Sequence, residues 1–289
     1  MTHFQPSIVA LLRTSIVSAL AASALVGVIG GVVTPARAEV ERPFARLVSV
    51  RTVAPFGASG SYMAPRFSPD GHQLLVTGAG YAGLTLLGLD GATQRLVDDA
   101  AAGVDARFLG AGLIGFSARR AGERRTLVVD RAGRVRMPAP AELPEPVAFA
   151  REDRIYVRTA AGLTAVGAGD KFFGPRPSPD GTRVAFQGIA TGIHVLDLRT
   201  LRVTHVAAGT APAWSPDGRF LVFERTEDDG HTIVASDLWL YEPAGRGLAR
   251  LTSSDDRLER RPSFSPDGRF VAFDDDHGTI LLAELEVSR

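Results

Sequence analysis

The sequence predicts an all-β fold, a six-bladed β-propeller with ring closure by an N-terminal strand, from three observations. The tetrapeptide Ser-Pro-Asp-Gly occurs four times along the chain. An aromatic residue or a proline precedes each copy and an apolar run follows it, as expected for two strands joined by a hairpin turn. Degenerate units fill the gaps between the four copies, giving six units of roughly forty residues, the length of a four-stranded propeller blade.

The repeated tetrapeptide is explained by the backbone geometry of a turn. Proline pre-sets the φ angle of the second turn position, aspartate accepts hydrogen bonds from nearby backbone N–H groups, and glycine adopts the positive φ that begins the next strand. We therefore expect structural rather than catalytic roles for the aspartate and glycine of each copy. These residues are Asp70, Gly71, Asp180, Gly181, Asp217, Gly218, Asp267 and Gly268.

The residue before each turn anchors one unit. The anchors are Phe67, Phe108, Phe149, Pro177, Trp214 and Phe264. The second strands, such as 219–223 and 269–273, are apolar on both faces, as expected for sheets sandwiched between neighbouring blades. The third unit is short and has room for fewer strands. We predict a propeller domain at 39–289, with blades near 63–100, 101–142, 143–171, 172–209, 210–257 and 258–289.

An unassigned apolar segment, 46–53, precedes the first unit, and the sixth unit ends after three strands. Pairing of 46–53 with the last strand of the sixth unit would remove an open sheet edge and close the ring. The alternative is a loose N-terminal tail. We expect 46–53 to form the closing strand.

The first 38 residues have the features of a secretory signal peptide. Arg13 precedes a long apolar run, and the small residues Ala36 and Ala38 mark a cleavage site before Glu39. The alternative is an uncleaved membrane anchor, because the run is near the ~20 residues that span a bilayer. We expect cleavage and a periplasmic or secreted protein, folded without disulfides because the chain has no cysteine.

The repeat resembles the propeller of TolB, the periplasmic component of the Tol-Pal system. The stretches 212–218, 236–241 and 250–253 match, in order, the turn, the third strand and the closing Leu-Thr strand of that family. The resemblance covers about 63–289 and implies a periplasmic repeat protein that binds a protein or cell-envelope partner. The separate N-terminal α/β domain of TolB has no counterpart between Glu39 and the first blade.

Sequence signatures of an enzyme are scarce. The hydrolase elbow Gly-x-Ser-x-Gly does not occur, the six histidines lack zinc-site spacing, and among the expected inner-strand starts only Asp105 is acidic. We therefore expect a non-enzymatic, monomeric binding or scaffolding propeller without a cofactor. The alternative is a hydrolase or lyase acting through the central channel. Acidic and basic residues are equal in number, 32 of each, which does not favour nucleic acid as a partner.

Charged loops between the second and third strands are the candidate binding surface. They place basic residues on blade two and acidic residues on blades five and six, which would give one face a positive and a negative pole. The acidic loops suit calcium in their oxygen content but lack the spacing of a calcium loop, and ordinary solvated turns are the alternative. The candidates are Arg119, Arg120, Arg124, Arg125, Asp228, Asp229, His231, Asp274, Asp275, Asp276 and His277.

Overall fold

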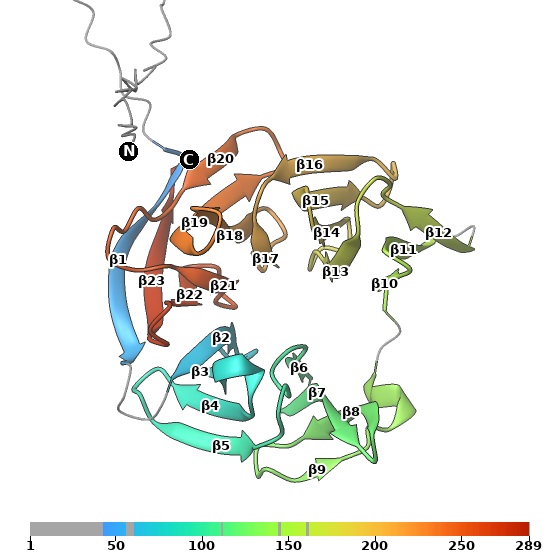
Figure 1. The fold of residues 1–289 in the computed structure, drawn as a ribbon, viewed down its shortest axis with the longest axis vertical. Helices are drawn as coiled ribbons and strands as arrows, with labels where there is room; N and C mark the ends of the chain where they lie inside the picture. The colour runs from blue at the N-terminus through green and yellow to red at the C-terminus, as the bar shows by residue number, and fades with distance from the viewer. Residues whose placement is uncertain (1–42, 56–60, 111, 144–145, 160–161, 289) are drawn as a thin grey trace, which may run out of the picture. The chain divides into compact units, whose positions relative to one another are not determined.

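The computed structural model describes residues 43–288 except 56–60, 111, 144–145 and 160–161. The predicted signal peptide lies outside the described residues. Within them, antiparallel strands form six sheets arranged as a six-bladed β-propeller, which confirms the predicted fold class (Figure 1). The first strand of each blade lies toward the centre of the ring and the last strand toward its outside.

The strands of the six blades follow one another along the chain. Blade one contains β2 (Tyr62–Phe67), β3 (Gln73–Gly78), β4 (Leu84–Gly88) and β5 (Thr93–Val97). Blade two contains β6 (Arg107–Leu109), β7 (Leu113–Arg120), β8 (Glu123–Val129) and β9 (Val135–Arg136). Blade three contains β10 (Ala148–Arg151), β11 (Arg154–Thr159) and β12 (Gly162–Val166).

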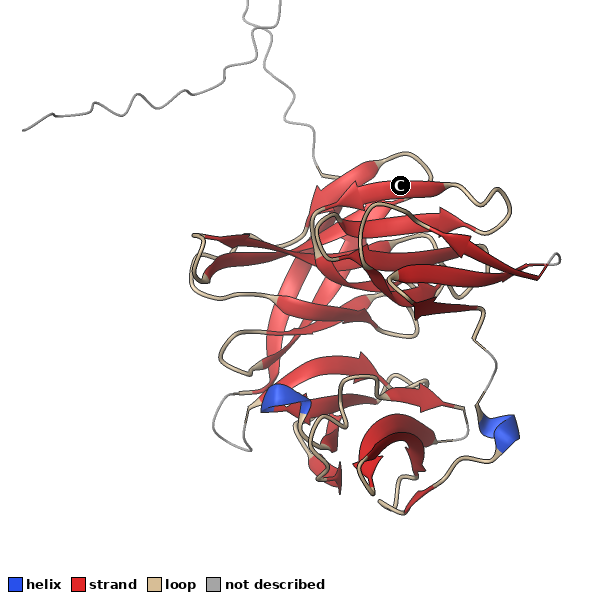
Figure 2. Cartoon of the chain, turned by 45° about the vertical axis from the view of Figure 1, so that its right-hand side comes forward, coloured by secondary structure: helices blue, strands red, loops and turns tan. Residues whose placement is uncertain are grey.

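The second half of the ring is built in the same way. Blade four contains β13 (Phe172–Pro177), β14 (Arg183–Gly188), β15 (Gly192–Asp197) and β16 (Val203–Ala207). Blade five contains β17 (Thr210–Trp214), β18 (Leu221–Asp228), β19 (Ile233–Glu242) and β20 (Gly247–Arg250). Blade six contains β21 (Arg260–Phe264), β22 (Phe270–Asp274), β23 (Ile280–Val287) and β1 (Ala45–Ala54). Helical structure in the described part is limited to two single turns, η1 (Ala79–Tyr81) and η2 (Pro140–Glu142) (Figure 2).

The N-terminal strand closes the ring. Strand β1 pairs antiparallel with β23, so the sheet of blade six has the order β1-β23-β22-β21. Val53 and Ala54 at the end of β1 are buried in one hydrophobic cluster with Leu74 of blade one and Leu282 of blade six. The predicted pairing of 46–53 with the last strand is thus confirmed.

Each Ser-Pro-Asp-Gly turn is held by the same internal hydrogen bonds. In blade five, the Ser215 hydroxyl donates to Asp217 Oδ1 over 2.6 Å and accepts the N–H of Phe220 over 2.9 Å. The Asp217 carboxylate also accepts the N–H of Arg219 over 3.0 Å. Gly218 has a φ of 71°, in the left-handed region where glycine is favoured.

Adjacent turns also touch one another around the ring. A Cβ on Gly218 would lie 2.8 Å from Cγ of Asp180 in the turn of blade four. At Gly71 and Gly268 a Cβ would meet Pro266 and Pro216 of the preceding blades at 3.5 and 3.6 Å, whereas at Gly181 nothing described lies within 4 Å. A Cβ would therefore overlap a neighbouring turn only at Gly218, whereas at Gly71 and Gly268 it would make ordinary van der Waals contact.

Buried hydrophobic clusters join neighbouring blades. One lies between blades one and two, and others between three and four, four and five, five and six, and six and one. No such cluster in the described part of the chain contains residues of both blade two and blade three. Blade three is also the sheet with three strands.

Candidate functional site

A cavity of about 590 Å³ lies among the inner strands, a size suited to a small-molecule ligand. Its walls come from β2, β13, β17 and β21, from Tyr81 in η1 and from the loop before β6 that carries Asp105. It is therefore built by five of the six blades, and we call it the central channel.

A bulge recurs where each of four inner strands reaches the channel. Ala64, Gly174, Ala211 and Arg261 occupy this place in β2, β13, β17 and β21 with positive φ values between 50° and 60°. The ladders of these blades shift register at the same place. The bulge turns the N–H of the residue away from its own sheet and toward the preceding blade.

Side chains of the preceding blade accept these N–H groups. Ala64 N–H donates to Asp274 Oδ1 over 3.0 Å and Ala211 N–H donates to Gln187 Oε1 over 2.8 Å. Arg261 N–H donates to Glu224 Oε2 over 2.6 Å. These bonds link blade six to one, four to five and five to six at the channel wall.

Asp274 is buried in this wall and not in an exposed loop, which corrects its expected place on the candidate binding face. It lies at the end of β22, where Arg261 Nε and Nη2 donate to its carboxylate. Burial raises the pKa of Asp274 to about 7, against the opposing effect of the Arg261 guanidinium. Its carboxyl group therefore titrates near neutral pH.

Two arginines, Arg66 of blade one and Arg176 of blade four, line one side of the channel. Arg107 of blade two is exposed and is not among the lining residues, but its positive charge acts on both of them. Burial and then repulsion by Arg176 lower the pKa of Arg66 to about 10. Burial has the largest effect in lowering the pKa of Arg176, followed by repulsion from the charge of Arg107. The side chain of Arg176 nevertheless keeps access to solvent through the channel.

Asp105 is a carboxylate that lines the cavity together with Arg66 and Arg176. Its Oδ1 accepts the Ser117 N–H over 3.0 Å, and its Oδ2 accepts the Ser117 hydroxyl over 2.5 Å. Arg124 Nη2 approaches Oδ2 at 3.3 Å. The carboxylate is thus fixed at the channel wall, and its charge attracts both Arg66 and Arg176.

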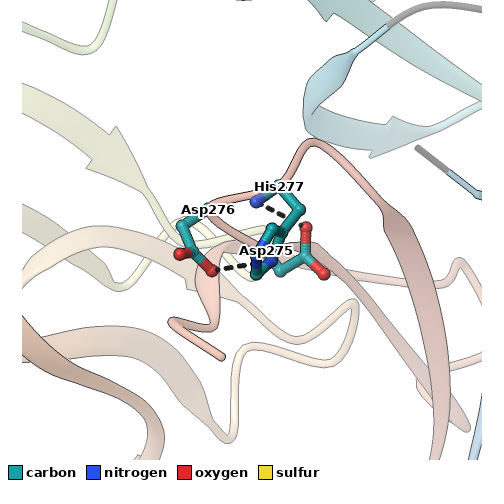
Figure 3. A group of neighbouring side chains, drawn as sticks. All are labelled: Asp275, Asp276 and His277. Carbon is teal, nitrogen blue, oxygen red and sulfur yellow. Dashed lines mark hydrogen bonds and ion pairs between the residues drawn. The ribbon is translucent and has the colours of Figure 1, made fainter. Parts of the chain in front are cut away.

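The loop 274–278 brings Asp275, Asp276 and His277 close together (Figure 3). Asp275 Oδ1 accepts the N–H groups of His277 and Thr279, over 3.0 and 2.8 Å. Asp276 Oδ1 accepts the N–H of Leu258 over 3.1 Å and lies 3.3 Å from Nδ1 of His277. These carboxylates cap the loop backbone. Asp275 is buried, which corrects its expected place on an exposed face, whereas Asp276 and His277 are exposed as the solvated-turn alternative expects. Calcium binding here stays an unsupported prediction.

The basic loop of blade two is largely paired with local acids. Arg120 donates to both carboxylate oxygens of Asp99, over 2.5 and 2.7 Å, and Arg125 Nη2 lies 3.0 Å from Glu123 Oε2. Arg124 of β8 contacts Asp105 at the channel, and Arg119 lies next to Arg120 in β7. The positive pole is therefore weaker than its arginine count indicates, and docking at this face stays a prediction.

The acidic loop of blade five is held in the same way as that of blade six. Asp228 Oδ1 accepts the N–H of Gly230 over 3.0 Å, and Asp229 Oδ1 accepts those of His231 and Thr232, over 2.9 and 2.8 Å. Asp228, Asp229 and His231 are exposed. Two of the candidate loop residues meet the channel wall: Asp274 through Ala64 and Arg261, and Arg124 through Asp105. None of the candidate loop residues is among the residues that line the cavity.

Comparison with known proteins supports the fold and little beyond it. No protein-family model and no curated protein sequence matches the chain. A TolB structure from Acinetobacter baumannii is 14% identical over 81% of this chain, with a TM-score of 0.37, and this chain spans 57% of that protein. A gluconolactonase from Xanthomonas campestris is 12% identical over 83% of this chain and 91% of its own, with a TM-score of 0.54. The shared feature is the propeller.

The gluconolactonase contradicts the expectation that the chain is not an enzyme. That expectation rested on the scarcity of acidic residues at the inner-strand starts. The structure shows that polar side chains also reach the channel from second strands, as Gln187 and Glu224 do. The residues at the starts of the inner strands are therefore only some of the polar groups that reach the channel.

Sequence reasoning missed the channel arginines, although a signal for them was present. Arg66, Arg107 and Arg176 each stand directly before an anchor residue, at Phe67, Phe108 and Pro177. Equivalent positions of repeated strands face the same way relative to the ring axis. Comparing this one position across the six units would have predicted the cluster.

Proposed function

We propose that the protein is an exported propeller that hydrolyses a small molecule in its central channel. The observation that carries the proposal is the position of Asp105, a carboxylate fixed at the wall of the cavity beside Arg66 and Arg176. A carboxylate and neighbouring guanidinium groups supply the two functions that hydrolysis of an ester or lactone needs: a base for water and donors for an oxyanion.

The proposed step follows from these roles. Asp105 takes a proton from water while the water oxygen adds to the substrate carbonyl carbon, and the guanidinium groups donate hydrogen bonds to the resulting oxyanion. When the carbonyl re-forms, the carbon–oxygen bond to the leaving group breaks, and the leaving oxygen takes the proton from Asp105. Water is thereby added across one bond without any redox change.

Export is proposed from the signal-peptide features of residues 1–38. No helix among the described residues is long and apolar enough to span a bilayer. A protein recovered from the producing cell with Glu39 as its first residue would support export, and full-length membrane-bound protein would contradict it.

The experiment for hydrolysis is a proton-release assay on a panel of lactones and carboxylic esters, both neutral and anionic. Asp105→Asn keeps the size of the side chain and an acceptor for the Ser117 N–H, so it should fold. We expect it to lower the rate by roughly 10²–10⁴-fold, the usual contribution of a general base. Asp98→Asn is the matched control, because Asp98 is 88% exposed and lies outside the cavity. Equal rates for Asp105→Asn and the parent protein, or no turnover across the panel, would overturn the proposal.

A further inference from the structure

The arginines that border Asp105 differ from the other arginine of the channel wall in having no acidic partner. Arg261 is paired with Asp274 through two hydrogen bonds. Within the described part of the chain, no ion pair or side-chain hydrogen bond joins Arg66, Arg107 or Arg176 to a carboxylate. Arg66 and Arg176 therefore bring two positive charges without an acidic partner to the lining of the cavity, and the charge of Arg107 acts on both.

The nearby carboxylates do not neutralise this side of the cavity. Asp105 carries one negative charge, whereas the three arginines carry three positive charges. Its carboxylate is also already bonded to Ser117 and Arg124. Glu224 also lines the cavity, but it belongs to blade five, where its two oxygens accept the Thr210 hydroxyl and the Arg261 N–H. The charges of the channel are thus segregated, with the excess positive charge on blades one, two and four.

Such a cluster is unfavourable in the absence of an anion. Burial and repulsion by neighbouring arginines lower the pKa values of both: Arg176 and Arg107 act on Arg66, and Arg107 acts on Arg176. The folded protein therefore disfavours their charged forms. At neutral pH both still carry their charge. An oxyanion placed among them would relieve the repulsion and accept their N–H groups.

We propose that Arg66 and Arg176, assisted by the positive charge of Arg107, form an oxyanion-binding site that selects small molecules carrying a carboxylate or phosphate group. The planar guanidinium group matches both oxyanions through paired N–H donors. As a statement of substrate class the proposal rests on the proposed hydrolase function, but anion binding itself does not depend on turnover. The position of the three arginines in equivalent places of three inner strands makes the site part of the rigid propeller wall.

The test is isothermal titration with inorganic phosphate, with the sugar acid glucuronate and with glucose as the neutral counterpart, at low and moderate salt. The variants are Arg66→Gln, Arg107→Gln and Arg176→Gln. Arg199→Gln is the control, since Arg199 is exposed and outside the cavity. We expect at least one anion to bind while glucose does not, and each channel variant to bind it about tenfold or more weakly. The preferred anion identifies the group, phosphate or carboxylate.

Melting temperatures without ligand separate a binding role from a structural one. Removal of an unpaired charge from the cluster should leave the melting temperature of Arg66→Gln and Arg176→Gln unchanged or higher. Lower melting temperatures, equal binding of glucose, parent-like affinity of the channel variants or no binding of either anion would overturn the proposal. Anion binding without hydrolysis of the ester panel would leave this site standing and refute only the proposed reaction.

Discussion

Among single residues, the turn glycines show how one repeated position has two physical roles. Gly181 and Gly218 have nearly the same φ, 69° and 71°, but only Gly218 faces the turn of a neighbouring blade. The repeated sequence predicted the positive φ at both. It could not predict the contact with Asp180, because that contact depends on the angle between blades.

The two glycines therefore form a matched pair for a stability measurement. Alanine at either position should lower the free energy of unfolding by about 1 kcal/mol, because it places a Cβ in the left-handed region. Gly218→Ala should cost about 1 kcal/mol more, because its Cβ would overlap Asp180. Urea unfolding of the two variants measures the difference, and equal losses would show that the turns do not press on one another.

The buried carboxyl group of Asp274 makes a prediction about pH. Its pKa of about 7 in the folded protein exceeds the ordinary value of 3.8, so the folded state binds the proton more tightly than the unfolded state. Its contribution to stability is therefore greatest below about pH 4 and is lost as the pH rises toward 7. Asp274→Asn should flatten the pH dependence of the unfolding free energy over this range. A slope identical to that of the parent protein would show that Asp274 is already ionised at low pH.

Among the elements, most strands and the closing role of 46–53 could be predicted from apolar patterning and turn residues. The bulges at Ala64, Ala211 and Arg261 could not, because nothing in the local sequence marks a positive φ at a non-glycine residue inside a strand. For the same reason the bonds that these bulges make to Asp274, Gln187 and Glu224 were not foreseen. Asp274 was instead grouped with the acids that follow it in sequence, of which Asp275 is also buried and Asp276 is exposed.

Removal of strand β1 tests the closure of the ring. A chain that begins at Phe56 lacks the strand that pairs with β23 and buries Val53 and Ala54. Compared with a chain that begins at Glu39, it should unfold at a markedly lower temperature, because blade six would expose a strand edge and the cluster with blade one would open. Equal melting temperatures in thermal denaturation would mean that β1 is only a tail.

For the whole molecule, the propeller fold followed from the repeats, but the candidate site did not. The sequence analysis predicted a binding surface in charged loops. Many charged side chains there instead bond to the backbone of their own loop, as Asp229 does, or to a neighbouring side chain, as Arg120 does. The channel arginines are far apart in sequence and converge only when the ring is formed. A site made by equivalent positions of several repeats is visible when the repeats are aligned, and not when loops are read one by one.

The central claim is that the central channel is the site of ligand binding. The most direct measurement is a crystal structure of Asp105→Asn with an anionic ester or lactone of the panel that the parent protein hydrolyses. The account predicts electron density for the compound inside the channel. Its anionic group and its carbonyl oxygen should both lie within hydrogen-bond distance of the guanidinium groups of Arg66 and Arg176, and its carbonyl carbon should lie next to residue 105. Density confined to the acidic loops around Asp229 or Asp276, with an ordered and empty channel, would contradict it.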